Sequence, residues 1–128
     1  MEIMTILVVE DNKQISGLIK KGLEMNDFRV ETAYDGSEAF DLARKNVYQA
    51  IIMDVMLPKM SGFEVTRKLR QEKIYTPIIM VSGRDSVEER QEGSDAGAND
   101  YLIKPFVFSE LINRINFHSA KKPAPKFR

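Results

Sequence analysis

The chain has 128 residues, of which 43% are hydrophobic and 30% are charged, and its 19 basic and 19 acidic residues cancel. This size and composition are typical of one globular domain with a single core, and the balanced charge argues against a general attraction to nucleic acid or an anionic membrane. The absence of cysteine excludes disulfides, thiolate-bound metals and a cysteine nucleophile.

Five short apolar segments follow one another along the chain, and we interpret them as β-strands. Three of them contain ILVV, AIIM or PIIMV, which are continuously apolar and rich in branched residues, as expected of strands covered by helices on both faces. The second segment, RVETA, is half polar and fits an edge position. In chain order, the predicted strands span residues 3–9, 29–33, 50–54, 77–81 and 101–103.

Between the strands the apolar period changes from two to about 3.6 residues, which indicates amphipathic helices. The second helix begins behind a predicted cap at Asp35-Gly36-Ser37. The last three predicted helices span residues 61–71, 86–95 and 108–119. The expected apolar faces consist of Ile15, Leu18, Ile19 and Leu23 in the first helix, Ala39, Phe40, Ala43 and Val47 in the second, and Leu111, Ile112 and Ile115 in the last.

Alternation of strands and helices with short connections predicts an α/β fold of the (βα)5 type, a doubly wound parallel sheet with helices on both faces. The final segment, SAKKPAPKFR, contains two prolines and four basic residues, so it cannot continue the last helix. We therefore assign residues 1–119 to one domain and residues 120–128 to a basic linker or tail. The single histidine, His118, makes a histidine-based metal site improbable, and we expect a solvated side chain there.

Charged and polar residues stand at the carboxyl ends of four predicted strands: Glu10 and Asp11 after the first, Asp54 at the third, Ser82 at the fourth and Lys104 at the fifth. Ligands of open parallel sheets bind outside these ends, so the five side chains are expected to converge. Three clustered carboxylates repel one another unless a cation intervenes. Mg²⁺, which prefers oxygen ligands and retains waters, suits such a site.

The motifs around these residues resemble the receiver domain of bacterial two-component response regulators. The resemblance covers roughly residues 3 to 118 and rests on the order and spacing of ILVVEDN, DVMLPKMSGFEV, VSGRD and GANDYLIKPF. It is strongest to the class whose output domain is a winged-helix DNA-binding domain. The resemblance implies a CheY/flavodoxin-like sheet with strand order 2-1-3-4-5 and a role in phosphorelay signal transduction and transcription regulation.

By this resemblance, Asp54 is the phosphoacceptor, and it takes the phosphoryl group from a phosphohistidine of a sensor histidine kinase. Asp11 and Asp54 would bind Mg²⁺ together with the backbone carbonyl of Met56. Glu10 stands where aspartate is commoner and would act on the metal directly or through a water. Lys104 would pair with Asp54 at rest and with a phosphoryl oxygen afterwards.

The resemblance also implies a conformational switch. Ser82 would swing inward to donate a hydrogen bond to the phosphoryl group, leaving space for Tyr101 to turn from outside to inside. Pro105 would follow a cis peptide bond with Lys104. The domain would catalyse its own phosphorylation and slow dephosphorylation without being a turnover enzyme, and it would relay its state to a C-terminal or separate output domain.

Three other functions fit parts of this pattern. A flavodoxin-like nucleotide binder needs a phosphate-cradling loop after the first strand, whereas Glu10-Asp11-Asn12 would repel an unaccompanied phosphate. A phosphatase of the haloacid dehalogenase type places a second aspartate two residues after the nucleophile, where this chain has Met56. A pseudo-receiver that binds proteins without being phosphorylated is the remaining alternative, although the acceptor, metal and lysine positions are all filled.

Association and location are also predicted from the sequence. Winged-helix regulators pair through an apolar patch ringed by ion pairs, and this chain retains ion-pair residues but has polar residues in place of the patch, so we expect a monomer or weak dimer. No apolar run approaches the ~20 residues of a membrane span, and no secretory signal is evident, which favours a cytoplasmic location. The retained ion-pair residues are Arg90, Asp100, Glu110 and Arg114, and the polar replacements are Gln91, Ser94 and Asn113.

Overall fold

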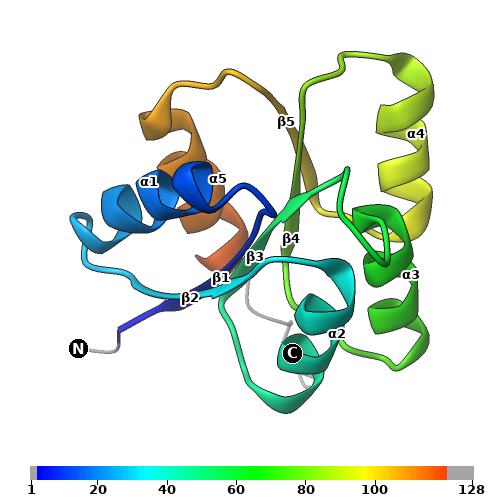
Figure 1. The fold of residues 1–128 in the computed structure, drawn as a ribbon, viewed down its shortest axis with the longest axis horizontal. Coiled ribbons are helices and arrows are strands. Elements are labelled where there is room, and N and C mark those ends of the chain that lie inside the picture. The colour runs from blue at the N-terminus through cyan, green and yellow to red at the C-terminus, as the bar shows by residue number, and fades with distance from the viewer. Residues whose placement is uncertain (1–2, 121–128) are drawn as a thin grey trace, which may run out of the picture.

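The apolar segments form five parallel strands in one sheet, ordered β2-β1-β3-β4-β5 (Figure 1). This computed structural model describes residues 3–120. Each strand pairs in parallel with its neighbours, and the half-polar β2 lies at an edge, so the predicted α/β class, doubly wound sheet and strand order are confirmed. The strands are β1 (Thr5–Val9), β2 (Arg29–Ala33), β3 (Ala50–Asp54), β4 (Ile78–Ser82) and β5 (Asp100–Ile103).

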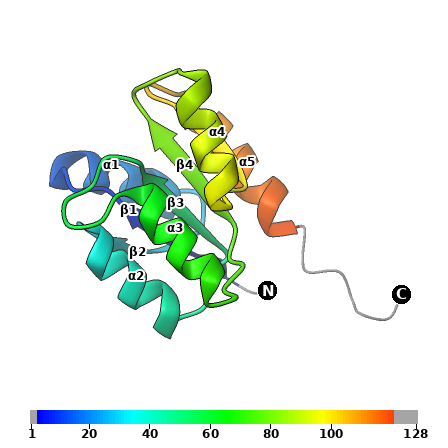
Figure 2. The same ribbon diagram turned by 90° about the vertical axis from the view of Figure 1, so that its right-hand side faces the viewer.

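Helices cover both faces of the sheet, with α1 and α5 on one side and α2, α3 and α4 on the other (Figure 1). Figure 2, turned by 90°, shows α3 and α4 side by side in front of the sheet. The connections between strands and helices span only a few residues, so the helices pack back onto the sheet at once. The helices are α1 (Lys13–Glu24), α2 (Gly36–Lys45), α3 (Gly62–Gln71), α4 (Val87–Ala96) and α5 (Phe108–Ala120).

Two hydrophobic cores, one on each face of the sheet, explain why the central strands are apolar throughout. Along β1, Leu7 and Val9 join the core under α2 and α3, whereas Ile6 and Val8 join the core under α1 and α5. Successive side chains of a strand point to opposite faces, so a strand buried on both sides can carry no polar position. In β3 and β4, the first polar residues are Asp54 and Ser82, at the carboxyl ends of the strands.

Side-chain caps fix where the helices begin. The Asn12 side chain accepts a hydrogen bond from the Ile15 N–H at 3.0 Å and begins α1, and Asp35 does the same for α2 through the Glu38 N–H at 2.7 Å. Such a cap satisfies one of the free N–H groups at a helix start. The cap predicted at Asp35-Gly36-Ser37 is confirmed, and α1 begins directly after the acidic end of β1.

Three sequence-based expectations about the helices are wrong. Leu18 is 70% exposed, because Ile19 and Leu23 face the sheet and Leu18 lies about 100° around the helix from Ile19. Ile15 is also exposed at the margin of this stripe. Val47 lies beyond the end of α2 at Lys45 and is exposed.

His118 is not solvated, contrary to the expectation from the sequence. Its side chain is only 10% exposed, and its Nε2 lies 2.8 Å from Oδ2 of Asp100 on β5. The error arises because the last turns of α5 still face the sheet, where both Arg114 and His118 contact Asp100, the first residue of β5. Helix α5 extends through Ala120, and the rest of the predicted tail, residues 121–128, lies outside the described residues. Within residues 3–120, no helix combines the length and apolar character needed to cross a bilayer.

Candidate functional site

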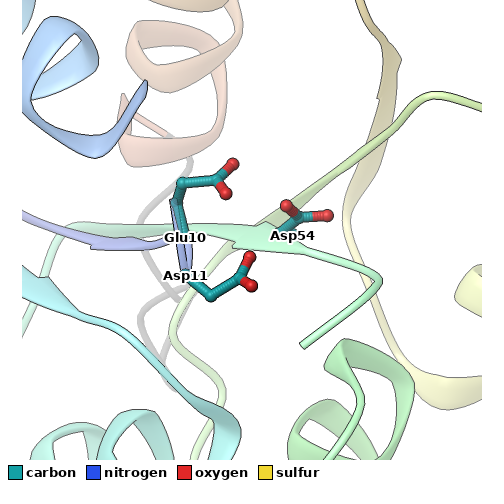
Figure 3. Close-up of side chains that lie close together, drawn as sticks. All are labelled: Glu10, Asp11 and Asp54. Carbon is teal, nitrogen blue, oxygen red and sulfur yellow. The ribbon is translucent and has the colours of Figure 1, made fainter. Parts of the chain in front are cut away.

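Three carboxylates converge at the carboxyl edge of the sheet. Glu10 and Asp11 follow β1, and Asp54 is the last residue of β3; the two strands pair in parallel with Val9 opposite Met53, so their ends lie together. The three side chains offer oxygen atoms that all lie within 4.8 Å of one another (Figure 3). Glu10 and Asp54 are buried and Asp11 is exposed, so the cluster is open to solvent on one side.

Lys104, which follows β5, supplies a positive charge to this cluster. Its Nζ donates hydrogen bonds to Oδ2 of Asp54 at 3.1 Å and to Oε1 of Glu10 at 3.2 Å. Burial alone would lower the pKa of Lys104, but the two carboxylates outweigh burial and raise the pKa, so the ammonium form is favoured. The peptide bond between Lys104 and Pro105 is cis.

Backbone N–H groups fix the two buried carboxylates. The Met56 N–H donates to Oδ1 of Asp54 at 3.2 Å, and the Asn12 N–H donates to Oε2 of Glu10 at 3.0 Å. Each of these carboxylates thus has one oxygen on a backbone donor and the other on Lys104. The Met56 side chain itself is 67% exposed, on the loop that leaves β3.

Negative charge exceeds positive charge at this edge, because three carboxylates face one lysine. An all-oxygen donor set with excess negative charge fits a hard divalent cation, so the acidic cluster could bind a metal ion. A cation bound there would offset the repulsion between the acidic cluster and an incoming phosphoryl group. A carboxylate such as Asp54 could then act as a nucleophile toward the phosphorus. The residues present therefore fit the metal that the sequence predicts.

Ser82 and Tyr101 stand beside the acidic cluster but contact a different residue. Ser82, the buried last residue of β4, donates from Oγ to Oε1 of Glu89 at 3.0 Å. Tyr101, on β5, donates from Oη to the same oxygen at 2.8 Å. Among residues 3–120, the structure shows no hydrogen bond between Ser82 and Asp54.

Glu89 is the site residue that the sequence analysis missed. It lies three residues after Ser86 at the start of α4, a spacing that indicates a capping box and hence a purely local role. The only sequence signal for a wider role is that α4 starts a few residues after Ser82. Which of its possible partners the glutamate contacts depends on how α4 packs beside β4 and β5, which the sequence pattern does not specify.

Comparisons with known proteins point to one family. The family model described as "Response regulator receiver domain" matches residues 6–116. The chain is 46% identical over 110 residues to "Response regulator MprA" of Mycobacterium sp. (strain KMS), an alignment that covers 86% of this chain and 48% of that protein. The chain thus spans about half the length of the curated relatives it matches.

Solved structures agree with this result. The Francisella response regulator 1452 receiver domain has a TM-score of 0.89 and 38% identity, with 94% of this chain and 99% of that chain covered. The receiver domain of sensor histidine kinase PA1611 from Pseudomonas aeruginosa, solved with a magnesium ion in its active-site cleft, has a TM-score of 0.87 and 33% identity, with 94% and 100% covered. This chain, with its parallel sheet and the acidic cluster at the strand ends, is thus similar to solved receiver domains over nearly its whole length.

Proposed function

This chain belongs to the response regulator receiver domain family, and on that premise we propose that Asp54 accepts a phosphoryl group in a Mg²⁺-dependent reaction. One observation carries the proposal: Asp54 ends β3 beside two further carboxylates and lies 3.1 Å from the Lys104 ammonium. A carboxylate that only stabilises the fold gains nothing from two like charges placed next to it. An acceptor that works with a cation requires them.

The residues proposed to hold Mg²⁺ are Glu10, Asp11, Asp54 and the backbone carbonyl of Met56. The acidic cluster supports this assignment, and so does the similar PA1611 receiver domain, which has a magnesium ion coordinated in its active-site cleft. When bound, the ion supplies positive charge to the phosphoryl oxygens. Glu10 reaches the site with one more methylene than an aspartate and retains the charge.

In the proposed reaction, an oxygen of the Asp54 carboxylate attacks the phosphorus of a phosphohistidine. A P–O bond forms as the P–N bond breaks, and the electron pair of that bond stays with the imidazole of the donor. Lys104 already donates to Asp54, so a small turn of its ammonium group would bring it to a phosphoryl oxygen. Ser82 would release Glu89 and donate to another phosphoryl oxygen, and Tyr101 would then turn inward.

The proposed donor is a sensor histidine kinase, and the proposed receiver of the signal is an output domain. The curated relatives are about twice as long as the segment they share with this chain, which supports an output domain in the parent protein. We propose transcription regulation as the purpose and the cytoplasm as the location. We expect no direct contact of this domain with nucleic acid or membrane, and a pseudo-receiver role is disfavoured because every site position is filled.

Intact-mass spectrometry tests the assignment. Incubation with acetyl phosphate and Mg²⁺ should add one phosphoryl group to the wild-type chain, and chelation of the metal should abolish the addition. Asp54→Asn should prevent it, whereas Asp41→Asn, which removes an exposed carboxylate from α2, should not. Undiminished phosphorylation of Asp54→Asn would refute the proposal.

A further inference from the structure

Glu89 connects the two predicted switch residues through a single oxygen atom. Its Oε1 accepts hydrogen bonds from Ser82 Oγ at 3.0 Å and from Tyr101 Oη at 2.8 Å. Its other oxygen, Oε2, lies 3.7 Å from a guanidinium nitrogen of Arg84, and the side chain is only 17% exposed. Hydrogen bonds to a carboxylate are stronger than those between neutral groups, so this arrangement holds both hydroxyls firmly.

The hydrogen-bonding capacity of Ser82 is used on the side facing α4. Its Oγ donates to Glu89 and accepts from the Arg84 N–H at 3.1 Å. Ser82 is buried, so its hydroxyl cannot leave these partners for water. To reach a phosphoryl group on Asp54, the hydroxyl must give up the bond to Glu89.

The Glu89 carboxylate accepts from Ser82 instead of accepting from the N–H of Ser86, the local partner that its position in α4 offers. It is the third residue of α4, and its N–H donates to the capping Ser86 Oγ at 3.0 Å. At the start of α3, the equivalent Glu64 carboxylate also accepts from the N–H of Ser61, completing a capping box. At α4 the described residues show only the first half of this motif, because the Glu89 carboxylate is turned toward Ser82.

An alternative partner is therefore available to Glu89 whenever Ser82 leaves. In a capping box the Ser86 N–H would donate to the Glu89 carboxylate, so Glu89 can exchange the two hydrogen bonds from Ser82 and Tyr101 for one from the backbone, with Arg84 still beside its other oxygen. A side chain with two satisfied positions suits a two-state element. In the same exchange Tyr101 would lose its shorter hydrogen bond, to Glu89, and keep only the 3.3 Å contact with the Arg84 carbonyl, which would couple its movement to that of Ser82.

We propose that Glu89 is a positioning residue that holds Ser82 and Tyr101 in the resting arrangement and so opposes phosphoryl uptake at Asp54. The inference rests on the proposed function, because it concerns the state that phosphorylation would have to leave. Removing the Glu89 carboxylate should destabilise the resting arrangement and so increase the population of the activated one. A ligand that needs the activated arrangement should then bind more tightly.

The test compares Glu89→Gln with Glu88→Gln. Glu88 is the exposed neighbour in the same first turn, so its substitution removes the same charge at the same helix end without touching Ser82. Beryllofluoride affinity and the rate of labelling by acetyl phosphate should both increase about three- to tenfold in Glu89→Gln, the effect expected when a charged hydrogen-bond acceptor becomes neutral. Glu88→Gln should stay within about twofold of wild type.

Glu89→Met, which removes the acceptor at similar length, should exceed the effect of Glu89→Gln, and thermal melts would confirm that each variant is folded. Unchanged or weaker beryllofluoride affinity in a folded Glu89→Gln protein would overturn the proposal. If the wild-type protein neither binds beryllofluoride nor accepts a phosphoryl group, the proposed function fails instead.

Even in that case, a second measurement tests whether Glu89 holds Tyr101. The pKa of Tyr101 is raised: burial raises it most, the neighbouring Ser82 hydroxyl lowers it, the Glu89 carboxylate raises it, and the Arg90 guanidinium over the ring lowers it. NMR titration of the Tyr101 ring carbons should show a lower pKa in Glu89→Gln than in Glu88→Gln. Equal values in the two variants would show that Glu89 does not hold Tyr101.

Discussion

Met56 and Arg84 are the residues that should set how long the phosphoryl group survives. In the family that this chain resembles, the residues two positions after the acceptor and after the switch serine flank the path of the attacking water. The Met56 side chain is exposed and offers no strong hydrogen bond, and the Arg84 side chain is exposed near Glu89 and cannot accept a proton. We therefore expect slow hydrolysis of the acyl phosphate.

Met56→Asn should increase the hydrolysis rate about tenfold, below the full effect of a general base, because an amide can orient a water without taking its proton. The measurement is the loss of the phosphorylated mass with time after the donor is removed, with Arg84→Gln measured in parallel. Met25→Asn, at an exposed position at the end of α1, is the control. Identical decay of the wild type and both site variants would exclude a role for these positions in hydrolysis.

The site can be predicted from the sequence to the extent that backbone position determines it. Asp54 and Lys104 stand at strand ends, and the parallel sheet alone brings them to one edge. Glu89 cannot be predicted in this way, because a glutamate after a capping serine has several partners within reach. The choice among them depends on packing between α4, β4 and β5.

At the scale of whole elements, the start of α2 touches the loop that leads from β3 to α3. A Cβ added to Gly36, the first residue of α2, would lie 2.0 Å from the carbonyl oxygen of Met60. The Gly36 N–H also donates to the Pro58 carbonyl at 3.2 Å. The close approach of the two backbones thus requires glycine at position 36. The contact between them supports the loop that carries Met56.

Gly36→Ala should lower the free energy of unfolding by about 1–3 kcal/mol, because the backbone of either segment must shift. Gly17→Ala is the matched control, since Gly17 lies inside α1 with nothing within 4 Å of an added Cβ. It should stabilise the protein by about 0.5–1 kcal/mol through helix propensity. Urea unfolding measures both, and equal stability of Gly36→Ala and the wild type would contradict the close approach.

Elements are predicted more reliably than the faces they bury. Strands β2 and β3 have the predicted bounds; for β3 the reason is that a continuous run of apolar and branched residues has few other uses in a chain of this size. The prediction for Leu18 is wrong because periodicity defines a stripe but not which part of it meets the sheet. The prediction for His118 is wrong because burial at a helix end depends on the neighbouring strand, which here presents Asp100.

At the scale of the whole molecule, α4, β5 and α5 form a face on which several charges are paired within the chain. Arg114 donates to both Asp100 and Glu110, and Arg90 pairs with Asp85. These pairs leave less charge free for contacts between two copies. Exposed ion pairs also contribute only about 0–1 kcal/mol each.

This face also lacks an exposed apolar centre. Gln91, Ser94 and Asn113 are exposed, and Ile112 is half-buried against the core of its own chain. Among the residues of these two helices whose exposure the structure describes, the exposed large apolar ones are Val87, at the start of α4, and Phe117, near the end of α5. Both helices run back against the parallel strands, so these two residues stand at opposite ends of the sheet rather than in one patch.

The domain should therefore remain largely monomeric at micromolar concentration, even when activated with beryllofluoride, because the centre of a contact supplies most of its energy. Analytical ultracentrifugation with and without beryllofluoride measures this. A tight symmetric dimer that Gln91→Arg and Ser94→Arg disrupt would contradict the expectation.

The most direct test of the central claim locates the phosphoryl group chemically. Borohydride reduces an aspartyl phosphate to homoserine, so peptide mapping after treatment with acetyl phosphate and Mg²⁺ should find homoserine at position 54 and aspartate at position 11. Without Mg²⁺, both positions should remain aspartate. Homoserine at another position, or none at position 54 in a protein that gains the phosphoryl mass, would contradict the assignment of Asp54 as the acceptor.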